Sequence, residues 1–182
     1  MTTLVTGASS GIGEALALEC AKRGETLFLS GRNAERLAAV AERCKALGAA
    51  AVFSKTVNVA DAEAMRSWME ECDAISPIER VFSNAGVSTG AETEANVRET
   101  FSVNVGGCLN TVLPAIDIMK QRGIIDPLAL FFVFAKQARD LFRILRDTKR
   151  MSVGIGILRI DRIDERCRSL LKQTHGRALL LF

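Results

Sequence analysis

A glycine-rich segment near the N-terminus most constrains the fold of this 182-residue chain. It covers residues 6–13 and reads Thr-Gly-Ala-Ser-Ser-Gly-Ile-Gly, between a β-prone run at residues 3–6 and a helical pattern that begins at Ile12. Glycines in this context let the backbone turn sharply, bring its amides close to a phosphate and allow a helix to pack tightly beneath. The segment therefore predicts a phosphate-binding loop, and the alternative is a glycine-rich connection without a ligand.

Strands and helices alternate along the first two-thirds of the chain. The β-prone runs after the first strand are residues 26–30, 51–57 and 80–83, and the helical patterns are residues 12–24, 34–47, 61–72 and 94–122. Connections of this length between strands indicate a parallel sheet with helices on both faces and ligands at the carboxyl ends of its strands. The predicted fold class is α/β, a Rossmann-like doubly wound parallel sheet of four supported strands that is incomplete at its C-terminal end.

Single residues predict where three of these helices begin or end. Lys22 and Arg23 followed by Gly24 suit a helix C-terminus, because cations complement the helix dipole and glycine adopts the left-handed cap. Asn33 and Asp61 precede helical patterns and are expected to be N-caps.

Three further motifs follow the glycine-rich segment. They are Asn58-Val59, Asn84-Ala85-Gly86 and Asn104-Val105-x-Gly107. In this order and spacing, over about residues 3–122, they resemble the short-chain dehydrogenase/reductase family. The resemblance implies that the first motif touches the adenine of a nicotinamide dinucleotide, that the second lies beside the nicotinamide ribose, and that Asn104 supports a proton path.

The nicotinamide cofactor is expected to be NADP rather than NAD. An NAD site places an Asp or Glu about twenty residues after the glycines, whereas this chain has Ser30, Gly31 and Arg32 there. The Arg32 guanidinium could bind the additional phosphate of NADP, and the alternative is a solvated loop arginine. The expected cofactor-binding residues are Gly7, Ser9, Gly11, Ile12, Gly13, Arg32, Asn58, Val59, Asn84, Ala85 and Gly86.

The resemblance ends near Gly123. Residues 1–123 are therefore predicted to be an NADP-binding Rossmann region, and residues 124–182 a divergent C-terminal part of the same domain. The family implies a catalytic serine followed by Tyr-x-x-x-Lys, but the chain has no tyrosine and no serine between Ser102 and Ser152. Phe132 and Lys136 keep the aromatic-x-x-x-Lys spacing, and the alternative is the chance start of an apolar helix. The candidate catalytic residues are thus Asn104 and Lys136, since a phenylalanine cannot transfer a proton.

The resemblance implies an NAD(P)(H)-dependent oxidoreductase that acts on an alcohol or carbonyl substrate and is impaired by the missing Tyr and Ser. Two alternatives remain open. One is a non-catalytic NADP(H)-binding protein. The other is a truncated or frame-shifted product, since codons for residues 133–138 shifted by one base can encode Tyr-Ser-x-Ser-Lys. The substrate, a small molecule, cannot be identified because the family's substrate loop has no match.

Composition excludes several other classes of protein. The five cysteines lack CxxC pairs, which argues against a disulfide framework or a metal site and fits a reducing cytoplasm. The N-terminus has no signal-peptide pattern, and the longest apolar run, residues 128–135, is too short to span a membrane. The net charge of +3 comes with no aromatic stacking pattern, so no nucleic-acid partner is expected. The family resemblance makes residues 94–122 the expected interface of a homo-oligomer.

Overall fold

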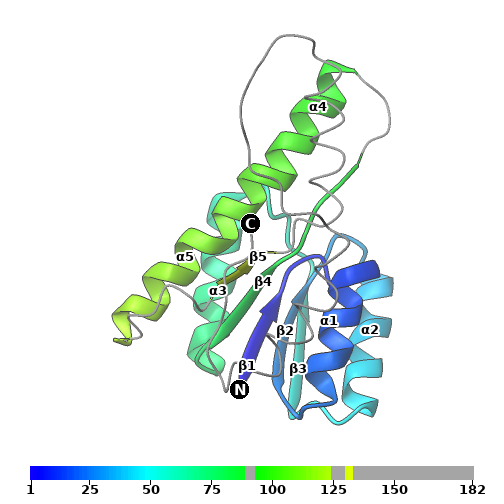
Figure 1. The fold of residues 1–182 in the computed structure, drawn as a ribbon, viewed down its shortest axis with the longest axis vertical. Coiled ribbons are helices and arrows are strands. Elements are labelled where there is room, and N and C mark those ends of the chain that lie inside the picture. The colour runs from blue at the N-terminus through cyan, green and yellow to red at the C-terminus, as the bar shows by residue number, and fades with distance from the viewer. Residues whose placement is uncertain (89–92, 124–129, 133–182) are drawn as a thin grey trace, which may run out of the picture.

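The computed structural model describes residues 1–88, 93–123 and 130–132, the last three as backbone only. These residues form a parallel sheet in the order β3-β2-β1-β4-β5 (Figure 1). The strands are β1 (Thr2–Val5), β2 (Thr26–Ser30), β3 (Ala51–Lys55), β4 (Arg80–Ser83) and β5 (Leu130–Phe132). The predicted Rossmann-like parallel sheet is confirmed.

Helices cover both faces of the sheet. They are α1 (Gly11–Ala21), α2 (Ala34–Ala46), α3 (Ala62–Ile75), α4 (Glu94–Phe101) and α5 (Gly107–Gln121), with a π-helical turn, η1 (Ser102–Gly106), between the last two. Neighbouring side chains of a strand point to opposite faces, so Val5 packs in the core beneath α1 and α2 while Leu4 packs in the core beneath α3 and α5. Helix α4 continues from α5 beyond the carboxyl ends of the strands (Figure 1).

The three predicted helix ends are confirmed. Gly24 follows α1 with a φ of +69°, the left-handed conformation that a glycine adopts without a steric penalty. The Asn33 side chain accepts a hydrogen bond from the backbone N–H of Arg36 at 2.8 Å. The Asp61 side chain accepts one from Ala64 at 3.0 Å, so both side chains cap their helices.

Two parts of the structure differ from the sequence expectations. The long helix over residues 94–122 contains the π-helical turn η1, which adds a residue to one turn and is invisible in a periodicity of three or four. The sequence predicted four supported strands, whereas Leu130–Phe132 form a fifth, β5, in which Phe132 lies opposite Ser83 of β4. Pairing with β4 gives these three residues of the apolar run 128–135 backbone partners that the sequence alone does not reveal. The residues after Phe132, including Lys136, lie outside the described residues, so the alignment of these two residues with the family's motif stays a prediction.

A buried ion pair lies at the amino ends of the central strands. Glu25 is 2% exposed and Arg80 is 7% exposed, and the Arg80 guanidinium donates to the Glu25 carboxylate. Thr3 on β1 joins them, since its hydroxyl donates to Glu25 at 2.6 Å and accepts from Arg80 Nε at 3.1 Å. This network links β1, the start of β2 and β4, and its charges are satisfied only while all three are in place.

The described cysteines are structural. Cys20, Cys44, Cys72 and Cys108 are free and buried, and burial raises the pKa of Cys20 and of Cys72 to about 12. Thiols held in the protonated form are poor nucleophiles and poor metal ligands. No group of His, Cys, Asp and Glu within the described residues could hold a metal ion.

Substituting Glu25→Gln should strongly destabilise the protein, because it leaves the buried Arg80 without a counter-charge. We expect a loss of about 3–5 kcal/mol in the free energy of unfolding, measured by urea denaturation. The control is Glu42→Gln, which removes an exposed ion pair with Lys45 and should leave stability nearly unchanged. Equal losses in the two variants would contradict a structural role for the buried pair.

Candidate functional site

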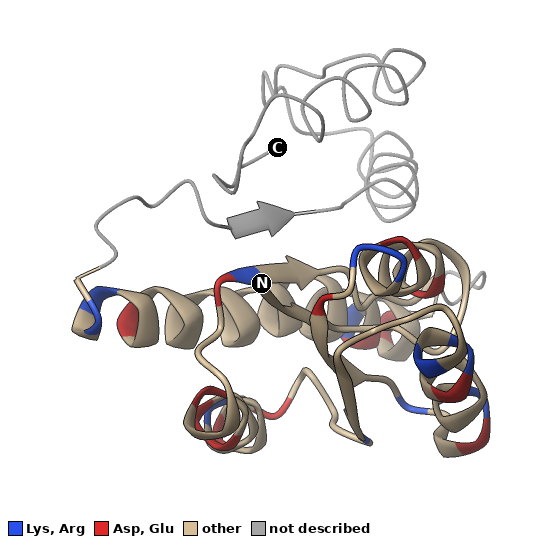
Figure 2. Ribbon diagram, turned by 90° about the horizontal axis from the view of Figure 1, so that it is seen from below, with Lys and Arg blue, Asp and Glu red and all other residues tan. Residues whose placement is uncertain are grey.

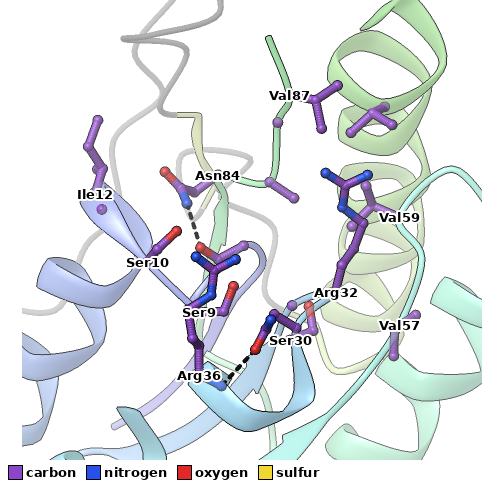
Figure 3. A pocket seen from close by; sticks show the side chains of 17 residues that line it. Ser9, Ser10, Ile12, Ser30, Arg32, Arg36, Val57, Val59, Asn84 and Val87 are labelled. Atoms are coloured by element: carbon purple, nitrogen blue, oxygen red, sulfur yellow. Dashed lines mark hydrogen bonds between the residues drawn. The ribbon is translucent and has the colours of Figure 1, made fainter. Parts of the chain in front are cut away.

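A cavity of about 580 Å³ opens at the carboxyl ends of the strands, between the connections that follow β1 and β4 (Figure 3). The strand order reverses here, because β2 and β3 lie on one side of β1 and β4 and β5 on the other. Such a switch point is where open α/β sheets bind ligands. The lining residues are Gly7, Ser9, Ser10, Gly11, Ile12, Ser30, Gly31, Arg32, Asn33, Arg36, Val57, Val59, Asn84, Ala85, Gly86, Val87 and Val103.

The N-terminus of α1 is open toward this cavity. Its N-cap residue, Ser10, makes no side-chain hydrogen bond to the helix, whereas Asn33, Asp61 and Thr93 each cap their own helices. The first backbone N–H groups of a helix have no partner within the helix, and they carry the positive end of its dipole. The α1 terminus therefore offers donors to a diphosphate at the cavity wall.

Glycines shape the loop for close approach. A Cβ on Gly13 would lie 2.3 Å from the carbonyl oxygen of Gly7 and 2.5 Å from Nδ2 of Asn84, so α1 can pack against the loop only with glycine there. Gly11 has a φ of +61°, and a Cβ built on it would meet nothing within 4 Å. The loop thus has open space where the backbone can meet a ligand, and the residues present fit a dinucleotide.

Asn84 joins the β4 connection to the glycine-rich loop. Its Nδ2 donates to the carbonyl oxygens of Thr6 at 3.1 Å and Gly7 at 3.3 Å. In return, the Thr6 hydroxyl accepts from the backbone N–H of Asn84 at 3.0 Å and of Ala85 at 3.1 Å. These bonds fix the two walls of the cavity relative to each other.

Asn104 holds the next part of the β4 connection. Its Oδ1 accepts from the backbone N–H of Val87 at 2.8 Å, and its Nδ2 donates to the Val87 carbonyl at 2.9 Å. Asn104 is 6% exposed and lies in the π-helical turn η1. Its amide therefore positions the cavity wall, in an arrangement that resembles a short piece of strand pairing.

The motif expected beside the adenine is divided by the structure. Val59 is buried and lines the cavity together with Val57 and Val103. Asn58 is exposed and outside the lining, because its Oδ1 accepts from the backbone N–H of Ala60 at 3.1 Å and closes a turn. Val57, Val59 and Val103 therefore form an apolar wall of the cavity.

Two arginines give the cavity its charge. Arg32 and Arg36 both line it, and no carboxylate is found among the described lining residues. Arg32 Nη1 lies 3.5 Å from Oε1 of Glu99 on α4, and both side chains are well exposed. Sequence reasoning missed Arg36, although its spacing of four residues from Arg32 was a usable signal once a helix start at Asn33 was expected.

The structure brings most of the predicted cofactor residues to one cavity. Those that line it are Gly7, Ser9, Gly11, Ile12, Arg32, Val59, Asn84, Ala85 and Gly86. Gly13 and Asn104 do not line the cavity. Gly13 lets α1 pack against the glycine-rich loop, and Asn104 holds the β4 connection at Val87. The candidate catalytic Lys136 lies outside the described residues.

Comparison with known proteins agrees with this geometry. Residues 1–125 match the family model described as short chain dehydrogenase. The chain belongs to the short-chain dehydrogenase family. Members of this family are oxidoreductases that use nicotinamide cofactors, and the match covers every motif from the glycine-rich loop to Asn104.

The match with each individual relative covers only part of that relative's length. The 11-beta-hydroxysteroid dehydrogenase A of Sesamum indicum is 36% identical over 110 residues, which are 57% of this chain and 32% of that protein. An uncharacterized oxidoreductase of Listeria innocua is 32% identical over 130 residues, which are 67% of this chain and 52% of that protein. The chain therefore spans about a third to a half of the length of these relatives.

Solved structures share the fold. A 3-ketoacyl-ACP reductase from Sinorhizobium meliloti is 27% identical with a TM-score of 0.63, covering 72% of this chain and 52% of that one. An alcohol dehydrogenase from the archaeon Thermococcus sibiricus, complexed with 5-hydroxy-NADP, has a TM-score of 0.69 at 24% identity. It covers 99% of this chain and 94% of its own, and at this identity it shows the fold alone.

Two glycine substitutions in the loop should differ in their cost. Gly13→Ala forces backbone atoms apart and should cost about 2 kcal/mol or more of stability. Gly11→Ala meets open space and adds only the strain of a left-handed alanine, about 1 kcal/mol. Thermal unfolding without nucleotide measures both, and a larger loss for Gly11→Ala would contradict the packing described for α1.

Proposed function

We propose that this chain binds NADP(H) in the cavity between β1 and β4, as a short-chain oxidoreductase whose turnover of alcohol or carbonyl substrates is impaired. The observation that supports NADP is the charge at the end of β2. Arg32 and Arg36 line the cavity there, without a described carboxylate in its wall. A carboxylate at this position would bond the ribose hydroxyl of NAD and repel the 2′-phosphate of NADP, whereas a guanidinium binds that phosphate.

Impairment rests on the residues that the chain lacks. It contains no tyrosine, and no serine lies between Ser102 and Ser152, so the family's proton donor and its carbonyl-polarising hydroxyl are both missing. Positioned proton transfer contributes about 10²- to 10⁴-fold to a rate. A non-catalytic NADP(H)-binding protein and a truncated or frame-shifted product are the two alternatives.

Saturating NADPH should raise the melting temperature of the purified protein by several degrees, with little effect from NADH. Nucleotide that binds only the folded state stabilises it by about 2.7 kcal/mol at 100 times its Kd, which corresponds to roughly 5–10 °C for a domain of this size. Differential scanning fluorimetry measures the shift. An equal or larger shift with NADH would contradict the preference for NADP.

Turnover separates the proposal from its alternatives. Oxidation of NADPH by a panel of aldehydes and ketones, followed by absorbance of the reduced nicotinamide, should stay close to background even where NADPH binds. Steady turnover of about 1 s⁻¹ or more, within the usual range of enzymes, would contradict impairment. A protein that neither unfolds cooperatively nor responds to either nucleotide would support the truncated or frame-shifted product.

We also propose that the protein is cytoplasmic and has neither a membrane nor a nucleic acid as a partner. The described cysteines are free and buried, which suits a reducing compartment. The helix Glu94–Gln121 has the length and composition of a membrane span, but half of its most apolar window is buried inside the protein, as in a core helix of a soluble protein.

The same long helix is our proposed homo-oligomer interface. Phe101, Val105, Leu109 and Leu113 are 40%, 37%, 50% and 54% exposed, and their spacing of four places them along one side of the helix. The charged side chains of α5 gather near its C-terminal end, which leaves most of its length uncharged (Figure 2). Exposed apolar rows of this kind are typical of contact surfaces.

Charging this row should dissociate the oligomer. We expect Leu109→Glu to reduce the molar mass in solution to that of one chain, measured by light scattering after gel filtration, because a carboxylate would be desolvated at the interface. Leu47→Glu is a matched control, since Leu47 is a 42% exposed leucine at the end of α2, away from the long helix. A Leu109→Glu variant with the wild-type mass, or a monomeric wild type, would contradict this interface.

A further inference from the structure

The peptide bond between Val59 and Ala60, in the connection from β3 to α3, is held at both of its polar atoms. Its carbonyl oxygen accepts a hydrogen bond from Nδ2 of Asn110 on α5 at 2.9 Å. Its N–H donates to Oδ1 of Asn58 at 3.1 Å. One of these asparagines lies just before the peptide and the other lies on a separate helix, so the plane of the peptide is fixed from two directions.

Helix α5 also touches the side chain of Val59. Gly107 is the first residue of α5, and a Cβ built on it would lie 2.5 Å from Cγ2 and 3.0 Å from Cβ of Val59. The Thr111 hydroxyl donates to the Gly107 carbonyl at 2.7 Å, which links the first two turns of the helix at this contact. Val59 is thus held by α5 at its backbone and is in close contact with α5 at its side chain.

Val59 belongs to the apolar wall of the cavity, on the side of Arg32 (Figure 3). It is 6% exposed, as is Val57, and both follow β3. Apolar walls in ligand sites suit flat rings, whereas phosphates and riboses need polar partners. The 2′-phosphate proposed at the end of β2 belongs to the adenosine half of the dinucleotide, so adenine is the ring that would meet this wall. The position of the Val59 backbone therefore sets the surface offered to adenine.

Asn104 and Asn110 belong to one helical stretch, η1 followed directly by α5. Asn104 holds the β4 connection at Val87 through hydrogen bonds of 2.8 and 2.9 Å. Asn110 holds the β3 connection, on the other side of β1. Asn110 is half-buried and does not line the cavity, so its influence on a ligand passes through Val59.

We propose that Asn110 is a positioning residue for cofactor binding, which sets the adenine wall by holding the Val59 carbonyl. This inference rests on the proposed binding of NADP(H) in the cavity. NADP(H) and NAD(H) share the adenine ring, so Asn110 contributes equally to the affinity for both and does not change the preference between them. This distinguishes its role from that of a group that contacts the 2′-phosphate.

The test measures the dissociation constants of NADPH and NADH by nucleotide fluorescence. Asn110→Leu removes the donor at similar size and without a charge, and leucine is the better helix former. Both constants should rise by about 3- to 10-fold, the range of one hydrogen bond, with their ratio unchanged. Asn110→Gln keeps an amide donor and should restore part of the lost affinity. Unchanged constants in Asn110→Leu, or no recovery in Asn110→Gln, would overturn the inference.

A double-mutant cycle tests whether Asn110 acts through Val59. Val59→Ala removes most of the side chain that Asn110 positions, so adding Asn110→Leu to this variant should change the constants by a factor close to one. The same factor in both backgrounds would show that Asn110 acts elsewhere, which contradicts the proposed role. A merely structural asparagine would give this second result, because its effect on stability would not depend on the Val59 side chain.

Two controls distinguish a local effect from a general one. Asn96→Leu makes the same change on α4, outside the cavity lining, and should leave both constants unchanged. Trp68 is the only tryptophan of the chain and packs in the same core cluster as Val59. Its emission maximum should be the same in Asn110→Leu and in the wild type. An equal loss of affinity in Asn96→Leu, or a red shift of Trp68 in Asn110→Leu, would contradict a local role.

The outcomes separate this inference from the proposed function. A wild type that binds NADPH, combined with an Asn110→Leu variant of equal affinity, would overturn the role of Asn110 and leave the proposed function intact. A wild type that prefers NADH, with both constants raised together in Asn110→Leu, would overturn the proposed preference for NADP and support the role of Asn110. A wild type that binds neither nucleotide would overturn both.

Discussion

The hydrogen bonds between Thr6 and Asn84 hold together the carboxyl ends of β1 and β4, and the rest of the site depends on them. The Thr6 hydroxyl accepts from the backbone of the β4 connection, and the Asn84 amide donates to the backbone of the glycine-rich loop. The backbone pairing of β1 with β4 reaches as far as the Thr6 N–H, which donates to the Phe82 carbonyl at 3.0 Å, and the side-chain bonds extend the connection beyond it. Because both ends are fixed, the α1 N-terminus and the β4 connection remain opposite walls of one cavity.

A second polar network stabilises the opposite end of the sheet. The ion pair of Glu25 with Arg80, joined by Thr3, connects the amino ends of the same central strands. The two networks differ in what they leave available. At the amino ends Glu25 and Arg80 neutralise each other, whereas at the carboxyl ends α1 has no side-chain cap and the Arg36 guanidinium forms no ion pair with any described residue. Unsatisfied donors gathered in one cavity are the arrangement that an anionic ligand completes.

The proposed cofactor binding and the proposed loss of catalysis depend on different parts of the chain. All the described residues that line the cavity belong to residues 1–123. The family's catalytic serine and tyrosine would follow that region, and neither has a counterpart in the sequence. Asn104 illustrates the division, since its amide is engaged by the backbone of Val87 and shapes the cavity wall. The proposed nucleotide binding thus depends on residues that the structure describes, whereas the proposed impairment depends on residue types that the sequence lacks.

The sequence by itself determined the features that depend on neighbouring residues. The alternation of apolar runs predicted the parallel sheet, Gly24, Asn33 and Asp61 predicted helix ends, and the glycine spacing predicted a loop at the strand-to-helix connection. Each of these follows from local backbone geometry or from hydrogen bonds within a few residues, so each can be read without the fold.

Only the tertiary structure decided how distant segments meet. The pairing of Glu25 with Arg80 joins residues 55 positions apart, and the contact of Arg32 with Glu99 joins two different layers. The π-helical turn at Asn104, the place of Phe132 in a fifth strand and the position of Arg36 in the cavity wall likewise depend on neighbours remote in sequence. Such contacts form because the chain folds back on itself, and a periodicity along one segment contains no information about the segment that will lie beside it.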